Sequence, residues 1–290
     1  MSRSLPFMQV DVFTARPFLG NPVAVVLDAD GLDDATMRRI ARWTNLSETT
    51  FVQSPTDPLA DYALRIFTPD RELPFAGHPT LGSARAVLAS GRASARDGRL
   101  VQQCAAGRVT LRVDGARQAF EAPPARVAPV SGEHAAELAR ALGLPGAPRG
   151  LESIDIGPVW LVAALDDAAT LLALEPDMAA LSALSRTLRA TGVTLHAPHP
   201  PGTRDADGLA PAIAVRSFAP AAGAPEDPVC GSGNACVALQ RRARGLREDY
   251  VATQGEAIGR AGRIAVSYRG ESIEVGGDAV ICVEGRIALD

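Results

Sequence analysis

The two halves of this 290-residue chain carry the same short motifs in the same order. The paired stretches, first copy against second, are NPVAVVLD 21–28 and GPVWLVAALD 157–166, RIFTP 65–69 and RSFAP 216–220, AGHPTLGSA 76–84 and CGSGNACVA 230–238, GRVTLRV 107–113 and GRIAVSY 262–268. A single match could arise by chance, but four matches in one order predict two similar lobes.

A Pro- and Ala-rich joint at 121–131 lies between these halves. We therefore predict an N-terminal lobe at 1–126 and a C-terminal lobe at 127–290, and the last strand could return to the first lobe. Short β-branched runs predict strands in both halves. They lie at 7–12, 23–27, 50–53, 62–67, 108–113, 117–121, 159–163, 212–218, 263–268, 272–275 and 279–284.

Each repeated AGHPTLGSA-type stretch continues as a helix that can end on a glycine, Gly91 or Gly245. Two further helices are predicted, one capped by Asp33 or Asp34 and one that opens at Pro176. The expected fold class is α+β, with two pseudo-symmetric lobes that are each a β-sheet rolled around a central helix.

Composition excludes several classes of protein. The chain is 47% apolar with a net charge of −4, and its arginines are spread out, so we expect no nucleic-acid partner. All 29 basic residues are arginine, which excludes Schiff-base chemistry on a lysine of this chain and the Walker P-loop.

Cysteine and histidine usage gives no sign of a metal site. The four cysteines form no CxxC pair and the four histidines are scattered, so we predict no metal and no cofactor. The N-terminus lacks the apolar core of a cleavable signal, and no apolar run reaches the length that would span a bilayer. A cytoplasmic location without membrane attachment is the resulting prediction.

The two repeated helix starts suggest an anion site. Helix N-termini offer unpaired N–H groups and a positive dipole end, so the starts at Gly77 and Gly231, if the lobes face one another, can hold a substrate carboxylate. The alternative for the first start is an ordinary N-terminus with Pro79 in its first turn.

Two residues are candidates for moving a proton. Glu48 lies between a predicted helix and a predicted strand, where burial could raise its pKa toward that of a working base, although glutamates at strand entrances are usually solvated. Cys230 at a helix start could become a thiolate, or could simply be a small residue at a tight turn. Because its counterpart is Ala76, racemisation by two thiols is not expected.

With these residues in view, the chain resembles the phenazine-biosynthesis PhzF-like isomerase family, which shares the diaminopimelate epimerase fold. The resemblance runs nearly end to end and rests on five motifs: VDVFTARPFLGNPVAVVL, NLSETTFV, RIFTPDRELPFAGHPTLGSA, EDPVCGSGNACVA and the tail QGEAIGRAGRIAV…GGDAVICVEGRI. It implies two lobes with the active site between them, and a homodimer.

The resemblance also implies roles for individual residues. Glu48 would be the general acid/base, His78, Asp227 and Ser232 would help in binding and proton handling, and Asn21 would contact the substrate. The helix starts at Gly77 and Gly231 would hold the carboxylate. The expected function is a cofactor-independent isomerase acting on a small carboxylate-bearing metabolite. The alternatives are an epimerase or racemase that uses Glu48 and Cys230, and a non-catalytic small-molecule binder.

Overall fold

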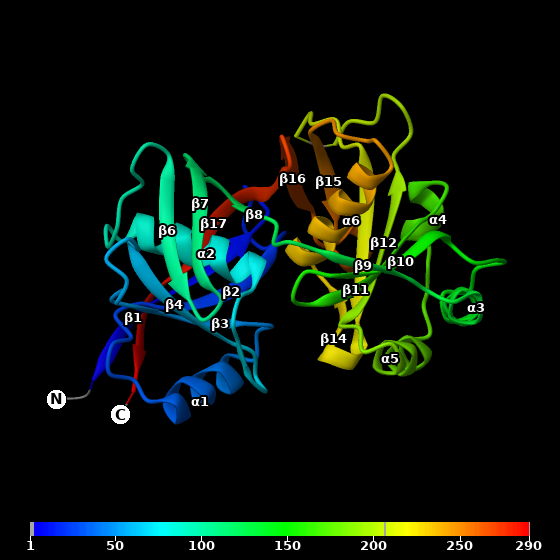
Figure 1. Cartoon of the computed structure of the whole chain (residues 1–290). Helices are drawn as coiled ribbons and strands as arrows, with labels where there is room; N and C mark the ends of the chain where they lie inside the picture. Colours follow the sequence, from blue (N-terminus) through cyan, green and yellow to red (C-terminus); the bar gives the residue numbers. More distant parts are fainter. Residues whose placement is uncertain (1–2, 206, 290) are drawn as a thin grey trace. The chain divides into compact units, whose positions relative to one another are not determined.

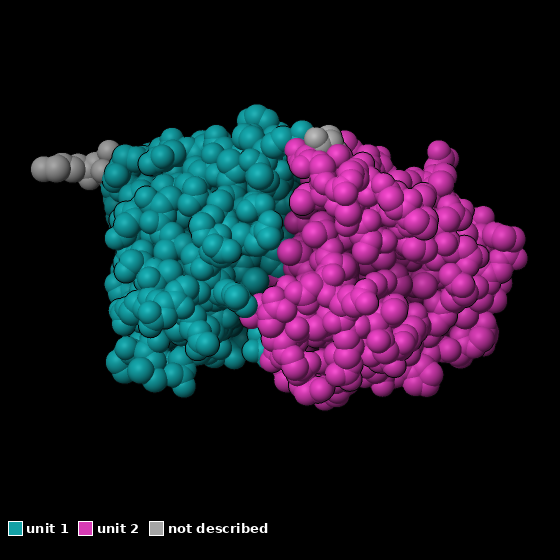
Figure 2. All heavy atoms as spheres, turned by 90° about the horizontal axis from the view of Figure 1, so that it is seen from above, with its two compact units in different colours: residues 1–121, 276–290 teal, residues 122–275 magenta. Residues whose placement is uncertain are grey.

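The computed structural model describes residues 3–205 and 207–289, and these divide into two compact units. Unit 1 comprises residues 1–121 and 276–290, and unit 2 comprises residues 122–275 (Figure 2). The units therefore divide at 121/122 and again at 275/276, whereas the predicted lobes divide once, at 126/127. The last fifteen residues of the chain are assigned to unit 1.

The fold is mixed α/β and rich in strands (Figure 1). The elements of unit 1 are β1 (Ser4–Val12), β2 (Asn21–Val26), α1 (Asp34–Thr44), β3 (Thr49–Gln53), β4 (Tyr62–Phe67), β5 (Glu72–Leu73), α2 (Gly77–Ala89), β6 (Arg99–Cys104), β7 (Gly107–Asp114) and β8 (Arg117–Glu121). The final strand, β17 (Ser272–Ala288), begins in unit 2 and continues in unit 1.

Unit 2 holds the remaining elements. They are β9 (Arg126–Pro129), α3 (Gly132–Ala141), β10 (Arg149–Asp155), β11 (Val159–Ala164), α4 (Ala168–Leu172), α5 (Met178–Thr187), β12 (Gly192–Pro198), β13 (Ile213–Ala219), η1 (Pro220–Ala222), β14 (Ala224–Asp227), α6 (Gly231–Ala243), β15 (Tyr250–Gln254), η2 (Glu256–Ile258) and β16 (Gly262–Arg269). Each predicted strand overlaps an observed one, and the two predicted at 272–275 and 279–284 form the single strand β17. The elements that were not predicted are β5, β6, β9, β10, β12, β14, β15, α3 and α4.

In unit 1 the strands pair in a closed ring. The ladder runs β1-β2-β3-β4-β6-β7-β8, and β17 pairs with both β8 and β1. Helix α2 packs against β1, β2, β3, β4 and β8, which gives a barrel-like core. A Cβ on Gly82 would lie 2.3 Å from Val23 Cγ1, so the glycine permits this close approach.

Helix α1 packs on the other face of the same sheet. Asp33 caps it by accepting a hydrogen bond from the Thr36 N–H, as predicted. Its apolar stripe of Met37, Ile40 and Ala41 packs against Phe51 and Phe67. Successive side chains of these strands point to opposite faces of the sheet, so one face packs against α2 and the other against α1.

In unit 2 the sheet is also covered on both faces. The apolar side chains of α3, α4 and α5 pack against one face of β11, β12 and β13. Helix α6 packs against β11, β12 and β16. Gly233 permits this contact, because a Cβ there would lie 2.6 Å from Thr194 Oγ1.

The arginine of the repeated RIFTP-type motif makes the same contacts in each unit. Arg65 forms a two-pronged ion pair with Glu72, and Arg216 forms one with Glu226. Each guanidinium also lies over the phenylalanine two residues later, at 5.1 Å and 4.9 Å from the ring centroids. The motif thus fastens one strand to the short strand after it.

The two pairs differ in burial, which predicts different energetic costs. The side chains of Arg216 and Glu226 are 5% and 8% exposed, against 27% and 30% for Arg65 and Glu72. Glu226→Ala leaves a buried cation and should lower the free energy of unfolding by about 3–5 kcal/mol. Glu72→Ala leaves Arg65 in contact with water and should lower the free energy of unfolding by about 1 kcal/mol. Urea denaturation of the two variants compares them, and equal losses would contradict this account.

Candidate functional site

The predicted site residues fall into one group in unit 1 and another in unit 2. Asn21, Glu48, Gly77 and His78 belong to unit 1, and Asp227, Cys230, Gly231 and Ser232 belong to unit 2.

Glu48 is the residue immediately before β3, and the turn that carries it is held at both ends. Helix α1 stops because Asn45 takes a left-handed conformation (φ 54°) and its N–H donates to the Ala41 carbonyl. The hydroxyls of Thr44 and Thr49 lie 2.7 Å apart across the turn. The Glu48 carbonyl accepts from the Ala24 N–H, which starts the β2–β3 ladder.

The Glu48 carboxyl is largely withdrawn from water, since its side chain is 16% exposed. Its Oε2 atom is buried and makes no hydrogen bond to any residue in the described part of the chain. Burial raises the pKa of Glu48 to about 7, and a hydrogen bond from Ser47 opposes the rise. Such a carboxyl can both accept and return a proton near neutral pH.

His78 lies beside this carboxyl. Its Nε2 atom is 3.3 Å from Glu48 Oε2, and its side chain is 8% exposed. It is the second residue of α2, so the start of the helix brings the imidazole to the strand entrance. The structure therefore brings together two residues that are 30 positions apart in the sequence.

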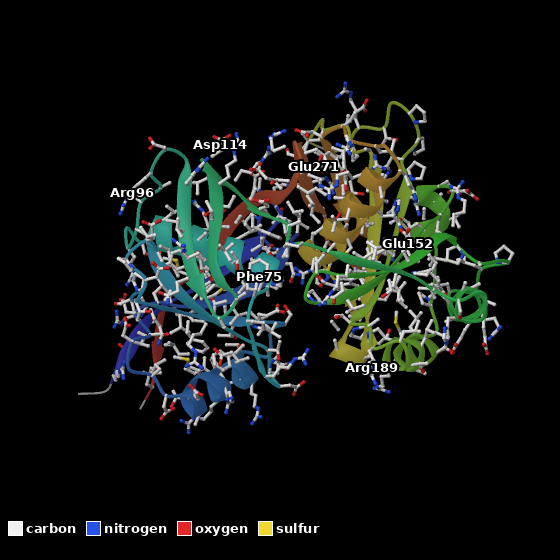
Figure 3. The ribbon with its side chains drawn as sticks, viewed as in Figure 1. Phe75, Arg96, Asp114, Glu152, Arg189 and Glu271 are labelled. Atoms are coloured by element: carbon white, nitrogen blue, oxygen red, sulfur yellow. The ribbon has the colours of Figure 1, made fainter. Side chains whose placement is uncertain are left out.

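The start of α2 carries no side-chain cap from its N-cap residue. Ala76 is the N-cap and provides no side-chain hydrogen bond to the first turn. The preceding Phe75, labelled in Figure 3, packs edge to face on Phe120 with ring centroids 5.5 Å apart, which fixes the entry of the helix. The N–H groups of Gly77 and His78 can bind a carboxylate in this position.

Asn21 is the first residue of β2 and is buried. The Gly20–Asn21 pair has a steric basis, because a Cβ on Gly20 would lie 2.2 Å from the Val12 carbonyl oxygen. The Gly20 N–H donates to a carboxylate oxygen of the buried Asp11. Asn21 is thus set rigidly at its end of the strand.

In unit 2, the predicted residues gather at the start of α6. Cys230 is the N-cap, and its sulfur accepts a hydrogen bond from the Gly233 N–H at 3.3 Å. Burial raises the pKa of the Cys230 thiol well above its usual range, and the charge of Asp227 raises it further. At neutral pH Cys230 is therefore a protonated thiol that caps the helix, and it is not a thiolate.

Ser232 and Asp227 flank this thiol. Ser232 Oγ lies 3.5 Å from Cys230 Sγ and accepts a hydrogen bond from the indole N–H of Trp160. Asp227 Oδ1 accepts from the Val229 N–H and so closes a turn over Pro228.

Sequence reasoning missed two residues of this group, Trp160 and Gln254. Gln254 is fully buried at the end of β15 and makes three hydrogen bonds to the segment that leads into α6 and its first turn. Its only signal in the sequence is its place before Gly255 in the tail motif QGEAIGR.

The described residues show neither a metal-binding group nor a membrane-spanning helix. Within residues 3–205 and 207–289, no group of three or more His, Cys, Asp or Glu side chains is placed to hold a metal ion. None of the helices in those ranges is both long and apolar enough to cross a membrane.

Comparison with known proteins agrees with the resemblance. The model of the PhzC-PhzF family, described as phenazine biosynthesis-like protein, matches residues 10–285. The chain belongs to the PhzF family. It is 34% identical to the trans-2,3-dihydro-3-hydroxyanthranilate isomerase of Pseudomonas aeruginosa, over 98% of this chain and 99% of the relative.

Other relatives cover the chain equally well. Antisense-enhancing sequence 1 of Schizosaccharomyces pombe is 39% identical over 97% of each chain. The solved structure of a predicted epimerase from Pseudomonas aeruginosa superposes with a TM-score of 0.79 at 29% identity, covering 98% of this chain and 99% of the other. The PhzF family is enzymatic and several of the relatives are named isomerases, so this chain is an enzyme of the isomerase type.

The raised pKa of Glu48 predicts how stability depends on pH. A carboxyl whose folded pKa exceeds its unfolded value stabilises the fold at low pH, and this contribution is lost as pH rises through the folded pKa. Relative to Glu48→Gln, the wild type should lose about 3 kcal/mol of unfolding free energy between pH 4.5 and about 7 and then level off. Urea denaturation of both proteins at several pH values measures the difference, and a flat difference would contradict the shift.

The state of Cys230 gives a second prediction. With iodoacetamide at pH 8, Cys104, which is partly exposed, should be alkylated at least about 10-fold faster than the buried Cys230 thiol. Peptide mapping by mass spectrometry gives both rates, and the same reaction in urea should remove the difference. Preferential modification of Cys230 in the folded protein would show that it is a reactive thiolate.

Proposed function

We propose that this enzyme is a cofactor-independent isomerase that moves one proton on a small carboxylate-bearing metabolite, with Glu48 as the general acid/base. The observation that carries the proposal is the buried Glu48 carboxyl. It has a pKa of about 7, an oxygen without a hydrogen bond in the described chain, and an imidazole nitrogen at 3.3 Å.

The proposed reaction needs only one group that carries a proton. The Glu48 carboxylate takes a proton from a substrate carbon, and the electron pair left behind is delocalised toward the substrate carboxylate or a conjugated double bond. The protonated carboxyl exchanges its proton with solvent and then delivers a proton to another carbon. Atoms and electrons balance within the substrate, so the reaction consumes no oxidant or reductant.

The substrate carboxylate is proposed to bind at helix N-termini. The first turn of α2 is the favoured position because Ala76 leaves its N–H groups without a side-chain cap. Negative charge that develops on a carboxylate bound there would be stabilised by the positive end of the helix dipole. Asn21, Asp227, Gly231 and Ser232 are proposed to contribute to binding, as the family resemblance implies.

Cys230 is better suited to a structural role than to that of a second base. Its thiol is protonated at neutral pH and its sulfur already accepts the Gly233 N–H. The epimerase alternative with Glu48 and Cys230 as opposed bases therefore has less support. The isomerase names of several relatives argue against a non-catalytic binder.

We also propose that the two units are copies of one design, each a sheet rolled around its helix. Support comes from the pairing order. The series β1-β2-β3-β4-β6-β7 and β10-β11-β12-β13-β15-β16 both run antiparallel, parallel, antiparallel, parallel, antiparallel. The homodimer and the cytoplasmic location stay predictions.

Proton transfer by Glu48 can be tested in heavy water. The purified enzyme, dialysed against EDTA, is incubated in D₂O with trans-2,3-dihydro-3-hydroxyanthranilate and with a panel of small amino and hydroxy acids. We expect one deuterium to enter the product, and Glu48→Gln should slow its entry by at least about 1000-fold. His78→Ala should slow turnover more than any loss of stability explains.

The matched control is Glu175→Gln, which makes the same chemical change at an exposed position of unit 2. It should exchange at the wild-type rate. Undiminished deuterium entry with a folded Glu48→Gln variant would overturn the role of Glu48. Wild-type activity that requires an added metal or nucleotide would overturn cofactor independence.

A further inference from the structure

Gln254 joins the turn before α6 to the sheet, and all of its side-chain hydrogen bonds go to that region. Its Oε1 accepts from the Cys230 N–H at 3.1 Å and from Asn234 Nδ2 at 2.8 Å. Its Nε2 donates to the Asp227 carbonyl at 3.1 Å. One amide therefore fixes the residue that ends β14 and the residue that caps α6.

The contacts below the turn leave it little room to move. A Cβ on Gly255 would lie 2.6 Å from the Pro228 carbonyl oxygen, and a Cβ on Gly262 would lie 2.4 Å from Val229 Cγ2. The Pro228 carbonyl therefore packs against Gly255, and the Val229 side chain packs against Gly262 at the start of β16. Gln254 is fully buried, so its hydrogen bonds act in a low-dielectric interior, where the loss of a partner is costly.

The effect of Gln254 reaches the groups expected to bind substrate. Asn234 Nδ2 also donates to the Cys230 carbonyl at 2.9 Å, which ties the first turn of the helix to the same amide. Gly231 and Ser232 lie between these two fixed points. Their N–H groups keep their direction only while the turn and the first helical turn are held together.

We propose that Gln254 is a positioning residue that holds the turn from Asp227 to Ser232, so that Asp227, Gly231 and Ser232 keep the arrangement needed to contribute to substrate binding. The inference rests on the proposed function, because it assigns the start of α6 to substrate binding. Gln254 itself would touch no substrate. Its loss should therefore weaken substrate binding while the chemistry at Glu48 stays intact.

The test compares Gln254→Leu with Gln240→Leu. Gln240 is a buried glutamine of α6 itself. Its Nε2 donates to the Gly150 and Val162 carbonyls and to the Glu152 carboxylate, away from the start of the helix. Gln254→Leu should raise the KM of a carboxylate substrate about 10-fold with kcat changed less than about 3-fold. Gln240→Leu should leave KM unchanged and lower only the amount of folded enzyme.

Hydrogen exchange supplies a readout that needs no substrate. The Cys230 amide donates to Gln254 Oε1, so Gln254→Leu should increase its exchange rate at least about 10-fold. In Gln240→Leu the rate should stay at that of the wild type. If no substrate is turned over by the wild type, the proposed function fails, and this measurement still decides whether Gln254 holds the turn.

If Gln254→Leu does not fold, the near-isosteric variant Gln254→Glu provides the test. Gln254→Glu replaces the Nε2 donor with a carboxylate oxygen that repels the Asp227 carbonyl. The turn should then shift, so KM should rise and the Cys230 amide should exchange faster. Unchanged KM together with unchanged exchange in a folded variant would overturn the proposal. Faster exchange with unchanged KM would also overturn it, because Gln254 would then be merely structural.

Discussion

The account depends on a carboxyl group kept out of water at the entrance of a strand. A buried carboxylate is costly unless its charge is compensated, and Glu48 responds through a raised pKa. The turn that holds it is fixed by the left-handed Asn45, by the Thr44–Thr49 hydroxyl contact and by the first rung of the β2–β3 ladder. These constraints keep the side chain from turning out to solvent, and His78 meets it from α2.

The repeated helix starts have the same backbone role and different chemistry. In unit 1, Ala76 leaves the first turn of α2 without a side-chain cap, which favours an external anion. In unit 2, the Cys230 sulfur fills that role within the protein, and the Gln254 amide fixes the approach to the helix. Each repeat keeps the arginine that pairs with a carboxylate and covers a phenylalanine. The arginine contacts are thus repeated while the polar groups at the helix starts differ.

Much of this could be predicted from the sequence because it depends on local patterns. The strand runs, the Asp33 cap and the repeated RIFTP-type motif all have short-range signals, and they were confirmed. Glu48 and His78 were named as site residues, but only the fold shows that they are neighbours, since the 3.3 Å contact joins a strand entrance to a helix start.

Other features carry no local signal. Strands β6 and β15 contain glutamines where a β-branched run was sought, so their periodicity was hidden. His196 belongs to a Pro-rich stretch of the sequence, yet it lies buried in β12, where burial lowers its pKa to about 4. The importance of Gln254 comes from bonds to backbone groups 24 and 27 residues away, which no spacing rule could reveal.

The state of the Glu48 carboxyl can be measured by NMR titration of protein labelled with ¹³C at the glutamate carboxyl carbons. The signal that is absent from Glu48→Gln identifies the residue. The account predicts a titration midpoint near pH 7 for this signal, well above the ordinary glutamate value of 4.5. A midpoint near 4.5 would show a solvated carboxylate and would contradict the role of Glu48 as a base held ready at neutral pH.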